Sequence, residues 1–218
     1  MGDKGYKGIG MKGPIARWYS KVTFNDLEQF RALARRMSSE LEQGARVLEV
    51  APGPGYFAIE LGKLGKYEIT GLDISETFVE IARMNAKREG VTIDFQHGNA
   101  SSMPFADNSF DLIVCRAAFK NFSAPVEALR EMRRVLRSDG RALIIDLRRD
   151  ASKQEIDAYI DEMKVGNMNA AFMKVAFRAM LLKRAYTRDE FARFAEQSGF
   201  QRYDVLQAPL GFEVWLYK

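Results

Sequence analysis

Short apolar runs alternate with amphipathic segments along most of this chain. Val47, Leu48 and Val50 form an apolar run typical of a buried parallel strand, and residues 56–64 suit the helix that follows it. Further strand-like runs lie near residues 68–72, 91–96, 110–115 and 141–147, and helical patterns occur near 76–88 and 123–137. This alternation predicts an α/β fold built on a doubly wound, mainly parallel sheet.

The N-terminal region divides into a segment without helical or strand pattern and a segment with a helical pattern. Residues 1–13 combine five glycines with several charges and little apolar surface, so we expect a flexible N-terminus, with Met11 as an alternative start. Residues 14–45 are expected to be helical. One helix is predicted at 26–43, where Asn25 provides the cap and Gly44 follows the end.

The C-terminal region has clear boundary signals. Thr187 and Glu190 have the spacing of a capping box, which opens a helix that ends before Gly199. Residues 202–206 and 212–217 then predict a closing antiparallel β-hairpin. We expect one domain over 1–218, with a core at 46–150 and the last helix and hairpin at 187–218.

The segment between core and last helix, 151–186, has an unusual pattern. Its second half is apolar around more than one helical face, with Phe172, Met173, Val175, Ala176, Phe177, Met180 and Leu181. Such a helix must bury both sides. We interpret the segment as a helical lid over a substrate pocket; ordinary core packing or a partner interface are the alternatives.

Composition excludes several classes of protein. The 218 residues contain one cysteine and one histidine, which leaves no internal disulfide and no multi-histidine metal site. No apolar run approaches the ~20 residues of a membrane span, so we expect a soluble, cytoplasmic protein without a bound metal. The net charge of +4 is spread along the chain and does not by itself indicate nucleic-acid binding.

A glycine-containing turn connects the first core strand to its helix. Gly53 and Gly55 permit close approach of a ligand to the backbone, and the helix N-terminus presents unpaired N–H groups. The turn also fits the dinucleotide fingerprint GxGxxG/A, with Asp73 about 20 residues on. Pro54 removes one N–H donor from the turn, which weakens it as a pyrophosphate site.

Four motifs in series narrow the choice of cofactor. They are Glu49-Val50-Ala51-Pro52-Gly53-Pro54-Gly55, Gly71-Leu72-Asp73-Ile74-Ser75, Gly98-Asn99-Ala100 and Phe110-Asp111-Leu112-Ile113-Val114-Cys115-Arg116. With these motifs the chain resembles the class I S-adenosylmethionine (SAM)-dependent methyltransferases over about residues 46–148. It is most similar to the small-molecule branch that includes the ubiquinone/menaquinone C-methyltransferases, on the segments Met103-Pro104-Phe105-Ala106-Asp107-Asn108-Ser109-Phe110-Asp111, Ala118-Phe119-Lys120-Asn121-Phe122 and Val135-Leu136-Arg137-Ser138-Asp139-Gly140. The resemblance implies a Rossmann-like sheet of about seven strands.

This resemblance also implies roles for individual residues. Gly53 and Gly55 would face the methionine moiety, and Glu49 would orient the loop or the cofactor's ammonium. Asp73 would accept both ribose hydroxyls, since a carboxylate can accept two O–H donors. Ile74 would cover the adenine ring. The side-chain oxygen of Asn99, beside Ala100, would accept a hydrogen bond from the adenine amino group. Ala51 replaces the usual first glycine, and Tyr19 and Arg116 complete the expected cofactor set.

Candidate groups for methyl transfer lie near the predicted strand ends. Asp146 and Arg148 follow the fifth strand, and Tyr19 precedes the first long helix; these three are our candidate catalytic residues. Trp18, Lys120, Arg149 and Tyr186 lie in the same predicted region. A general base is needed only if the nucleophile arrives protonated, so the sequence isolates none of them as the catalytic group.

Three functions remain open at this point. The first is a methyltransferase that acts on a small molecule, with S-adenosylhomocysteine (SAH) as its product, working as a monomer or homodimer. The others are a SAM-binding protein without transferase activity and a nicotinamide-dependent oxidoreductase. Nucleic acid is disfavoured as the acceptor, because Cys115-Arg116-Ala117-Ala118 replaces the Asn/Asp-Pro-Pro-aromatic motif of amino-methylating enzymes.

Overall fold

A single mixed sheet organises the described part of the molecule. The computed structural model describes residues 5–7, 10–162, 182–208 and 210–218. Within them the strand order is β3-β2-β1-β4-β5-β7-β6. The strands are β1 (Arg46–Val50), β2 (Glu68–Asp73), β3 (Asp94–His97), β4 (Phe110–Arg116), β5 (Leu136–Leu147), β6 (Arg202–Gln207) and β7 (Gly211–Tyr217). The predicted seven-stranded Rossmann-like α/β sheet is confirmed.

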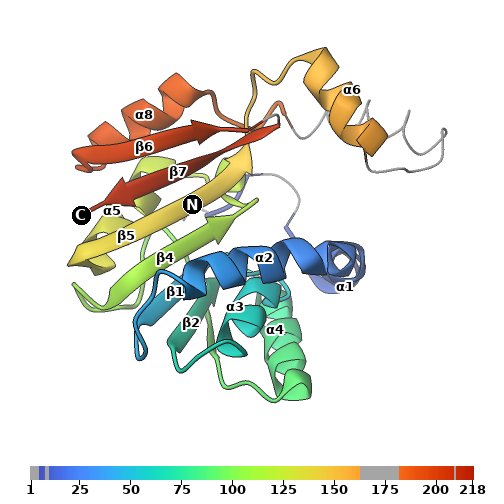
Figure 1. Cartoon of the computed structure of the whole chain (residues 1–218), viewed down its shortest axis with the longest axis vertical. Coiled ribbons are helices and arrows are strands. Elements are labelled where there is room, and N and C mark those ends of the chain that lie inside the picture. Colours follow the sequence, from blue (N-terminus) through green and yellow to red (C-terminus); the bar gives the residue numbers. More distant parts are fainter. Residues whose placement is uncertain (1–4, 8–9, 163–181, 209) are drawn as a thin grey trace.

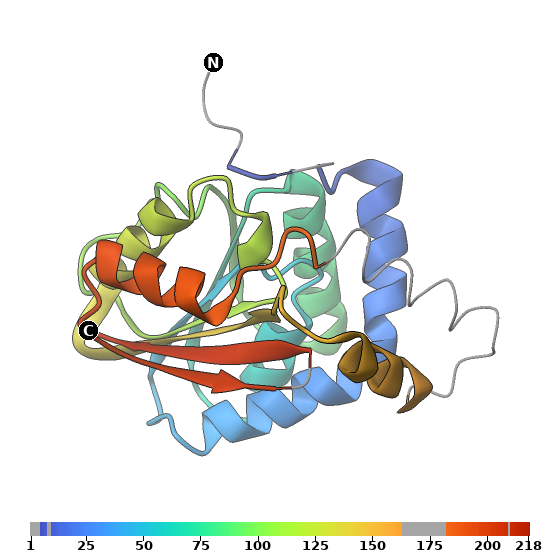
Figure 2. The ribbon, with the colours of Figure 1, turned by 90° about the horizontal axis from the view of Figure 1, so that it is seen from above.

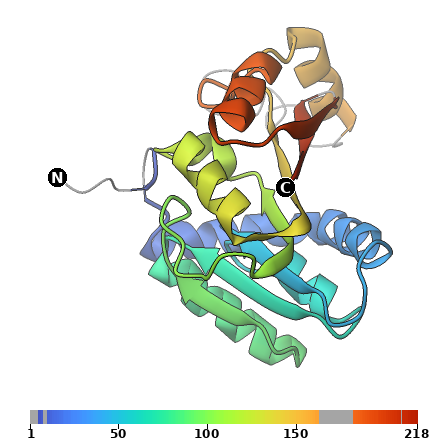
Figure 3. The same ribbon diagram turned by 90° about the vertical axis from the view of Figure 1, so that its left-hand side faces the viewer.

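Helices cover both faces of this sheet (Figures 1 and 3). They are α1 (Gly13–Thr23), α2 (Leu27–Ser38), α3 (Tyr56–Gly62), α4 (Glu76–Glu89), α5 (Pro125–Val135), α6 (Lys153–Glu162) and α8 (Arg188–Gln197), with 3₁₀ turns η1 (Phe24–Asp26) and η2 (Phe119–Asn121). The core on one face joins α2, α3 and α4 to the strands, with Phe57 and Leu112 fully buried. The core on the other face joins α5 and α8, with Leu129 and Phe191 fully buried. Strands that are buried on both faces explain the continuous apolar runs in the sequence.

The last two strands distinguish this sheet from the dinucleotide-binding one. β7 is inserted between β5 and β6 and pairs antiparallel with both. The dinucleotide-binding fold has six strands in the order 3-2-1-4-5-6. The topology therefore argues against the nicotinamide-dependent alternative, although the glycine turn alone fits both.

Most predicted elements are present, with shifted ends. The capping box is complete, because the Thr187 side chain accepts from the Glu190 N–H and the Glu190 side chain accepts from the Thr187 N–H. The helix predicted at 26–43 was too long: α2 ends at Ser38, and Gly44 (φ 82°) lies in the turn before β1. The sequence patterns also missed α1 as a separate helix, although Pro14 stands in its first turn, a position that suits proline.

Only the two ends of the predicted lid, residues 151–162 and 182–186, lie among the described residues. α6 lies beyond the carboxyl end of β5 (Figure 1), where Ile156 and Ile160 pack with Leu182 and Leu210. Phe172, Phe177 and the rest of 163–181 lie outside the described residues. The lid, like the division of the chain into segments, stays a prediction.

Candidate functional site

The glycine turn lies at the carboxyl end of β1, between the ends of β2 and β4. Because parallel neighbours end at the same edge, β1, β2 and β4 bring Glu49, Asp73 and Arg116 to one side of the sheet. The turn is held from outside by α4, where the Asn85 side-chain amide donates to the Pro54 carbonyl at 2.9 Å. Asn85 is a supporting residue that the sequence motifs did not single out.

The residues of the turn have different reasons for their identity. Gly53 (φ 54°) has open space where a Cβ would stand, as expected for a backbone that faces a ligand. Gly55 (φ 79°) does not, because a Cβ there would come within 2.7 Å of the Phe95 ring. The absence of a side chain at Gly55 therefore already serves internal packing. Ala51 also lies in the left-handed region (φ 57°), at a cost of about 1 kcal/mol relative to glycine.

Glu49 accepts a hydrogen bond from the first turn of α3. Its carboxyl group is buried, and Oε2 accepts a hydrogen bond from the Ala58 N–H at 3.1 Å. Burial raises the pKa of Glu49 to about 8, although the Ala58 bond and the Arg116 charge both lower it. Glu49 is therefore mostly protonated near neutral pH when no cation is bound beside it.

Asp73 ends β2 and makes contact with the turn directly. Its Oδ2 accepts from the Gly53 N–H at 2.9 Å, and its Oδ1 accepts from the Ser75 N–H at 2.8 Å. Burial raises the pKa of Asp73 to about 6, against the effect of these two bonds. Each oxygen keeps a further lone pair, so the carboxylate can still accept two hydroxyl donors.

Ile74 and Asn99 lie side by side next to Asp73. Gly5 packs against both of them, so the three residues share one small patch. The Asn99 Oδ1 accepts from the Ser101 N–H at 2.9 Å, which closes a local turn and leaves one lone pair for an outside donor. Ala100 is partly buried and packs against the hydrophobic core, so it supports this turn.

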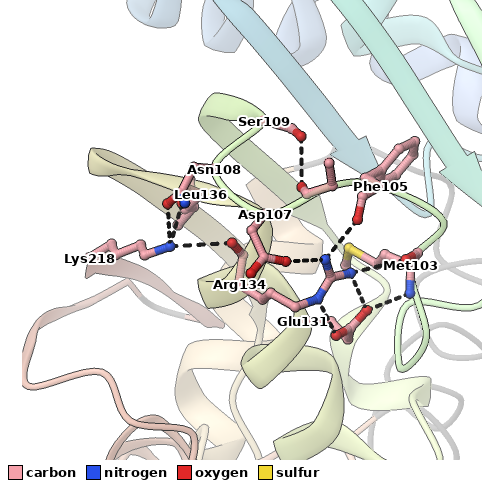
Figure 4. Close-up of polar contacts among 10 residues, drawn as sticks. Met103, Phe105, Asp107, Asn108, Ser109, Glu131, Arg134, Leu136 and Lys218 are labelled. Carbon is pink, nitrogen blue, oxygen red and sulfur yellow. Dashed lines mark hydrogen bonds and ion pairs between the residues drawn. The ribbon is translucent and has the colours of Figure 1, made fainter.

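The loop after Asn99 is clamped by two residues of α5 (Figure 4). Arg134 donates to the carbonyls of Met103 and Phe105 at 3.0 and 2.7 Å, and Glu131 accepts from the Met103 N–H at 2.7 Å. Arg134 and Glu131 also bond each other. The loop that carries Asn99 is therefore fixed by partly buried, charge-assisted bonds.

Tyr19 and Arg116 lie near enough to each other for the Arg116 charge to act on the Tyr19 phenol. Tyr19 packs edge-on against Phe78 at 5.8 Å between ring centroids, and burial raises the pKa of its phenol, against the effect of the Arg116 charge. Arg116 lies over the Phe30 ring at 4.3 Å and donates to the Gln29 side chain at 2.8 Å. Trp18, the neighbour of Tyr19, is 63% exposed.

The structure gives two of the candidate catalytic residues internal partners. Asp146 Oδ1 accepts from Lys120 Nζ at 2.9 Å, Oδ2 accepts from the Lys120 N–H at 2.8 Å, and both side chains are buried. Arg148 is buried as well and pairs with Asp150 and Glu155. These contacts favour positioning roles for Asp146 and Arg148, and leave Tyr19 as the candidate group at the transfer position.

Two further features bound the chemistry of the described residues. The described residues include no group of three His, Cys, Asp or Glu side chains that could bind a metal ion. No helix among these residues is long and apolar enough to cross a membrane. A surface cavity of about 290 Å³ lies at α6, with a basic rim of Arg149, Lys153 and Lys183. It shares no lining residue with the glycine turn, so we place the site by the strand ends instead.

Comparisons with known proteins agree with this geometry. Residues 48–144 match the family model described as "Methyltransferase domain". The chain is 40% identical over 110 residues to an "uncharacterized methyltransferase YcgJ" of Bacillus subtilis, over 50% of this chain and 43% of that protein. It is 39% identical over 108 residues to a demethylmenaquinone methyltransferase of Deinococcus radiodurans, over 49% and 45% of the two chains. The match thus spans a little under half the length of these curated relatives.

The fold has a counterpart over the whole chain. A crystal structure from Methanococcus maripaludis, provisionally described as an S-adenosyl-L-methionine-dependent methyltransferase, matches with a TM-score of 0.78. The match covers 100% of this chain and 97% of the other at 21% sequence identity, so it bears on the fold alone.

Proposed function

The chain belongs to the class I SAM-dependent methyltransferases, and we propose that it transfers the methyl group of SAM to a small-molecule acceptor. The observation that carries the proposal is the buried Asp73 carboxylate, which joins the end of β2 to the glycine turn through the Gly53 N–H at 2.9 Å. Its remaining lone pairs suit the two hydroxyls of a ribose. Gly53 is open toward the same region.

The residues around Asp73 fit the other parts of the cofactor. Ile74 offers an apolar surface for the adenine ring, and Asn99 Oδ1 retains one lone pair for its amino group. Glu49 and Arg116 provide an acid and a cation for the methionine ammonium and carboxylate. When bound, SAM supplies a methyl group already activated on a sulfonium, so this chain must mainly orient the acceptor and exclude water.

Tyr19 is the residue that we place nearest the transfer. Its phenol is neutral near pH 7, and burial raises its pKa further above that range, so the hydroxyl can donate a hydrogen bond to an acceptor oxygen. Lys120 and Asp146 shape the turn after β4, since Lys120 Nζ also donates to the Ala117 carbonyl at 2.6 Å. Ala117 has a left-handed backbone (φ 57°) that this bond helps to hold.

We propose a compact apolar or anionic acceptor. Several similar proteins carry the name demethylmenaquinone methyltransferase, and this supports the apolar class. Lys153 and Lys183, on the cavity at α6 beyond the carboxyl end of β5, support an acceptor with negative charge that extends from the strand ends toward α6; Arg149 beside them pairs with Glu190. A monomeric or homodimeric state and a cytoplasmic location remain predictions.

A methyl-transfer screen tests this function. Purified protein is incubated with methyl-labelled SAM and, separately, metabolite extract, bulk RNA or whole-cell protein. We expect labelling in the metabolite fraction together with formation of SAH. Labelling of RNA or protein alone would contradict the small-molecule acceptor. Tight binding of SAM without SAH formation in any fraction would favour the SAM-binding protein without transferase activity.

Cofactor binding is expected to release a proton through Glu49. At pH 7 this carboxyl group, with a pKa of about 8, is about nine-tenths protonated in the free protein, and a cationic ammonium beside it would ionise it. Affinity should then rise with pH up to about 8. Titration calorimetry of SAH in phosphate and in Tris measures the protons released. We expect a value approaching one for the wild type.

The matched variant is Glu49→Gln, which keeps an acceptor for the Ala58 N–H and lacks the titrating group. Asp73, with a pKa of about 6, still contributes about a tenth of a proton at pH 7 in this variant. Equal proton release in wild type and variant would show that Glu49 does not pair with the cofactor.

A further inference from the structure

The N-terminal residues Gly5–Lys7, which we call the strap, are attached to the turn after β4. Tyr6 forms an antiparallel bridge with Phe122, and the Lys7 N–H donates to the Asn121 carbonyl at 2.7 Å. Figure 2 shows this dark blue segment ahead of α1, at the edge of the domain. The strap is thus an ordered part of the described structure, far in sequence from the residues that it contacts.

At one end the strap lies on the patch that we assign to adenine. Gly5 is buried and has φ +66°, and a Cβ on it would overlap the Ile74 side chain and come within 2.9 Å of Asn99 Nδ2. Only glycine fits at this contact without displacing one of the two residues. The backbone of the strap therefore contacts the same side chains as the proposed cofactor.

In the middle of the strap, Tyr6 bridges to Phe122 and lies within range of the Asp73 charge. Burial raises the pKa of its half-buried phenol; the Arg184 charge opposes this shift and the Asp73 charge adds to it. Tyr6 also contributes to the raised pKa of Tyr19. The two phenols and Asp73 therefore share one region, and the hydroxyl of Tyr6 stays neutral at ordinary pH.

At the other end the strap is tied to the acceptor side. Lys7 Nζ donates to the Tyr186 hydroxyl at 2.8 Å and lies 5.2 Å from the centroid of the same ring. Tyr186 packs on Phe119 of the turn after β4, at 5.9 Å between centroids. Beside the strap, the Ser123 hydroxyl oxygen is buried and makes no hydrogen bond among the described residues, so it offers a polar group to a ligand.

We propose that the strap forms an outer wall of the cofactor site, in which Tyr6 contacts the bound cofactor and the Lys7–Tyr186 bond holds the wall in place. This inference rests on the proposed function, because it requires that SAM and SAH bind between Asp73 and Asn99. A cofactor behind this wall leaves only when the strap moves. The strap therefore slows dissociation and strengthens binding, while methyl transfer itself needs no group from it.

The test compares binding of SAH to strap variants by calorimetry and stopped-flow. Tyr6→Ala removes an aromatic contact, and we expect a dissociation constant about 5- to 30-fold larger, mainly through faster dissociation. Gly5→Ala should give a similar loss, because its methyl group displaces the strap from Ile74. Lys7→Met should increase the dissociation rate by a few fold and leave association nearly unchanged.

The controls separate a wall from a merely structural segment. Tyr203→Ala removes a tyrosine on the edge strand β6 and should bind SAH as the wild type does. Tyr6→Phe keeps the ring and should stay within about threefold of the wild type. Thermal unfolding without ligand reports whether each variant is folded.

Wild-type affinity in folded Tyr6→Ala and Gly5→Ala would overturn the strap proposal and leave the proposed function standing. If Tyr6→Ala and Gly5→Ala fail to fold, the dissociation rate of Lys7→Met decides, and an unchanged rate overturns the proposal. Absence of SAH binding to the wild type would instead contradict the proposed function, and the strap proposal with it.

Discussion

Asp73→Ala is expected to weaken SAH binding by about 10- to 150-fold. The variant removes an ionised acceptor for two hydroxyls, which corresponds to about 1.5–3 kcal/mol. It also removes the acceptor of the Gly53 N–H, so the glycine turn loses one of its anchors. Calorimetric titration of wild type and variant at pH 7.5 measures the change.

Glu76→Ala is the matched control for this variant. Glu76 opens α4 three residues after Asp73, with a side chain 81% exposed, so its removal changes the local charge equally but leaves the site intact. Its SAH affinity should stay within about twofold of the wild type. An unchanged dissociation constant in Asp73→Ala, with the fold intact, would remove Asp73 from the cofactor site and contradict the proposed function.

The pKa of Asp73 adds a pH dependence to the same prediction. The ionised form binds the hydroxyls, so affinity is present above pH 6 and is lost as the pH falls through about 6. At pH 5 about a tenth of the free protein is competent, which corresponds to a dissociation constant roughly tenfold higher than at pH 7 from this group alone. In Asp73→Ala this part of the pH dependence should be absent.

The elements of the fold were largely predictable because their signals are local. The capping box at Thr187 and the apolar run at Val47–Val50 depend on neighbours within a few residues, and both are present as predicted. The end of α2 was not predicted correctly. The apolar helical pattern continues past Ser38 to Leu41, whereas Gly44 lies in a turn that is set by β1 and β2. Local propensity was overridden there by tertiary structure.

The candidate site divides in the same way. Glu49, Gly53 and Asp73 could be predicted as neighbours because they lie at or just after the ends of strands in a recognisable order, and the structure brings them together. The partners of Asp146 were not, because Lys120 stands 26 residues away and meets it only when β4 and β5 pair. The strap lay further beyond reach, since Lys7 and Tyr186 are 179 residues apart in sequence. Gly55 has an additional reason for its identity that the motif did not reveal, because the Phe95 ring leaves no room for a Cβ there; its contact with the cofactor stays a prediction.

The buried pair of Lys120 and Asp146 gives the largest expected effect on stability. Their side chains are 7% and 3% exposed, and the carboxylate also accepts from the N–H groups of Lys120 and Leu147. Lys120→Met would leave Asp146 as an uncompensated buried charge. We expect the free energy of unfolding, measured by urea denaturation at pH 7.5, to fall by about 3–5 kcal/mol.

Two further variants test the cause of this loss. Lys120→Met/Asp146→Asn removes the charge together with its partner and keeps one acceptor oxygen, which can serve one of the two N–H groups, so it should recover about half of the loss. Arg35→Met breaks the exposed pair with Glu28, whose side chains are 57% and 70% exposed, and should cost less than about 1 kcal/mol. A loss as small as this in Lys120→Met would mean that water or a neighbouring group compensates Asp146. The carboxylate would then be accessible, and a catalytic role for Asp146 would again be favoured over a positioning one.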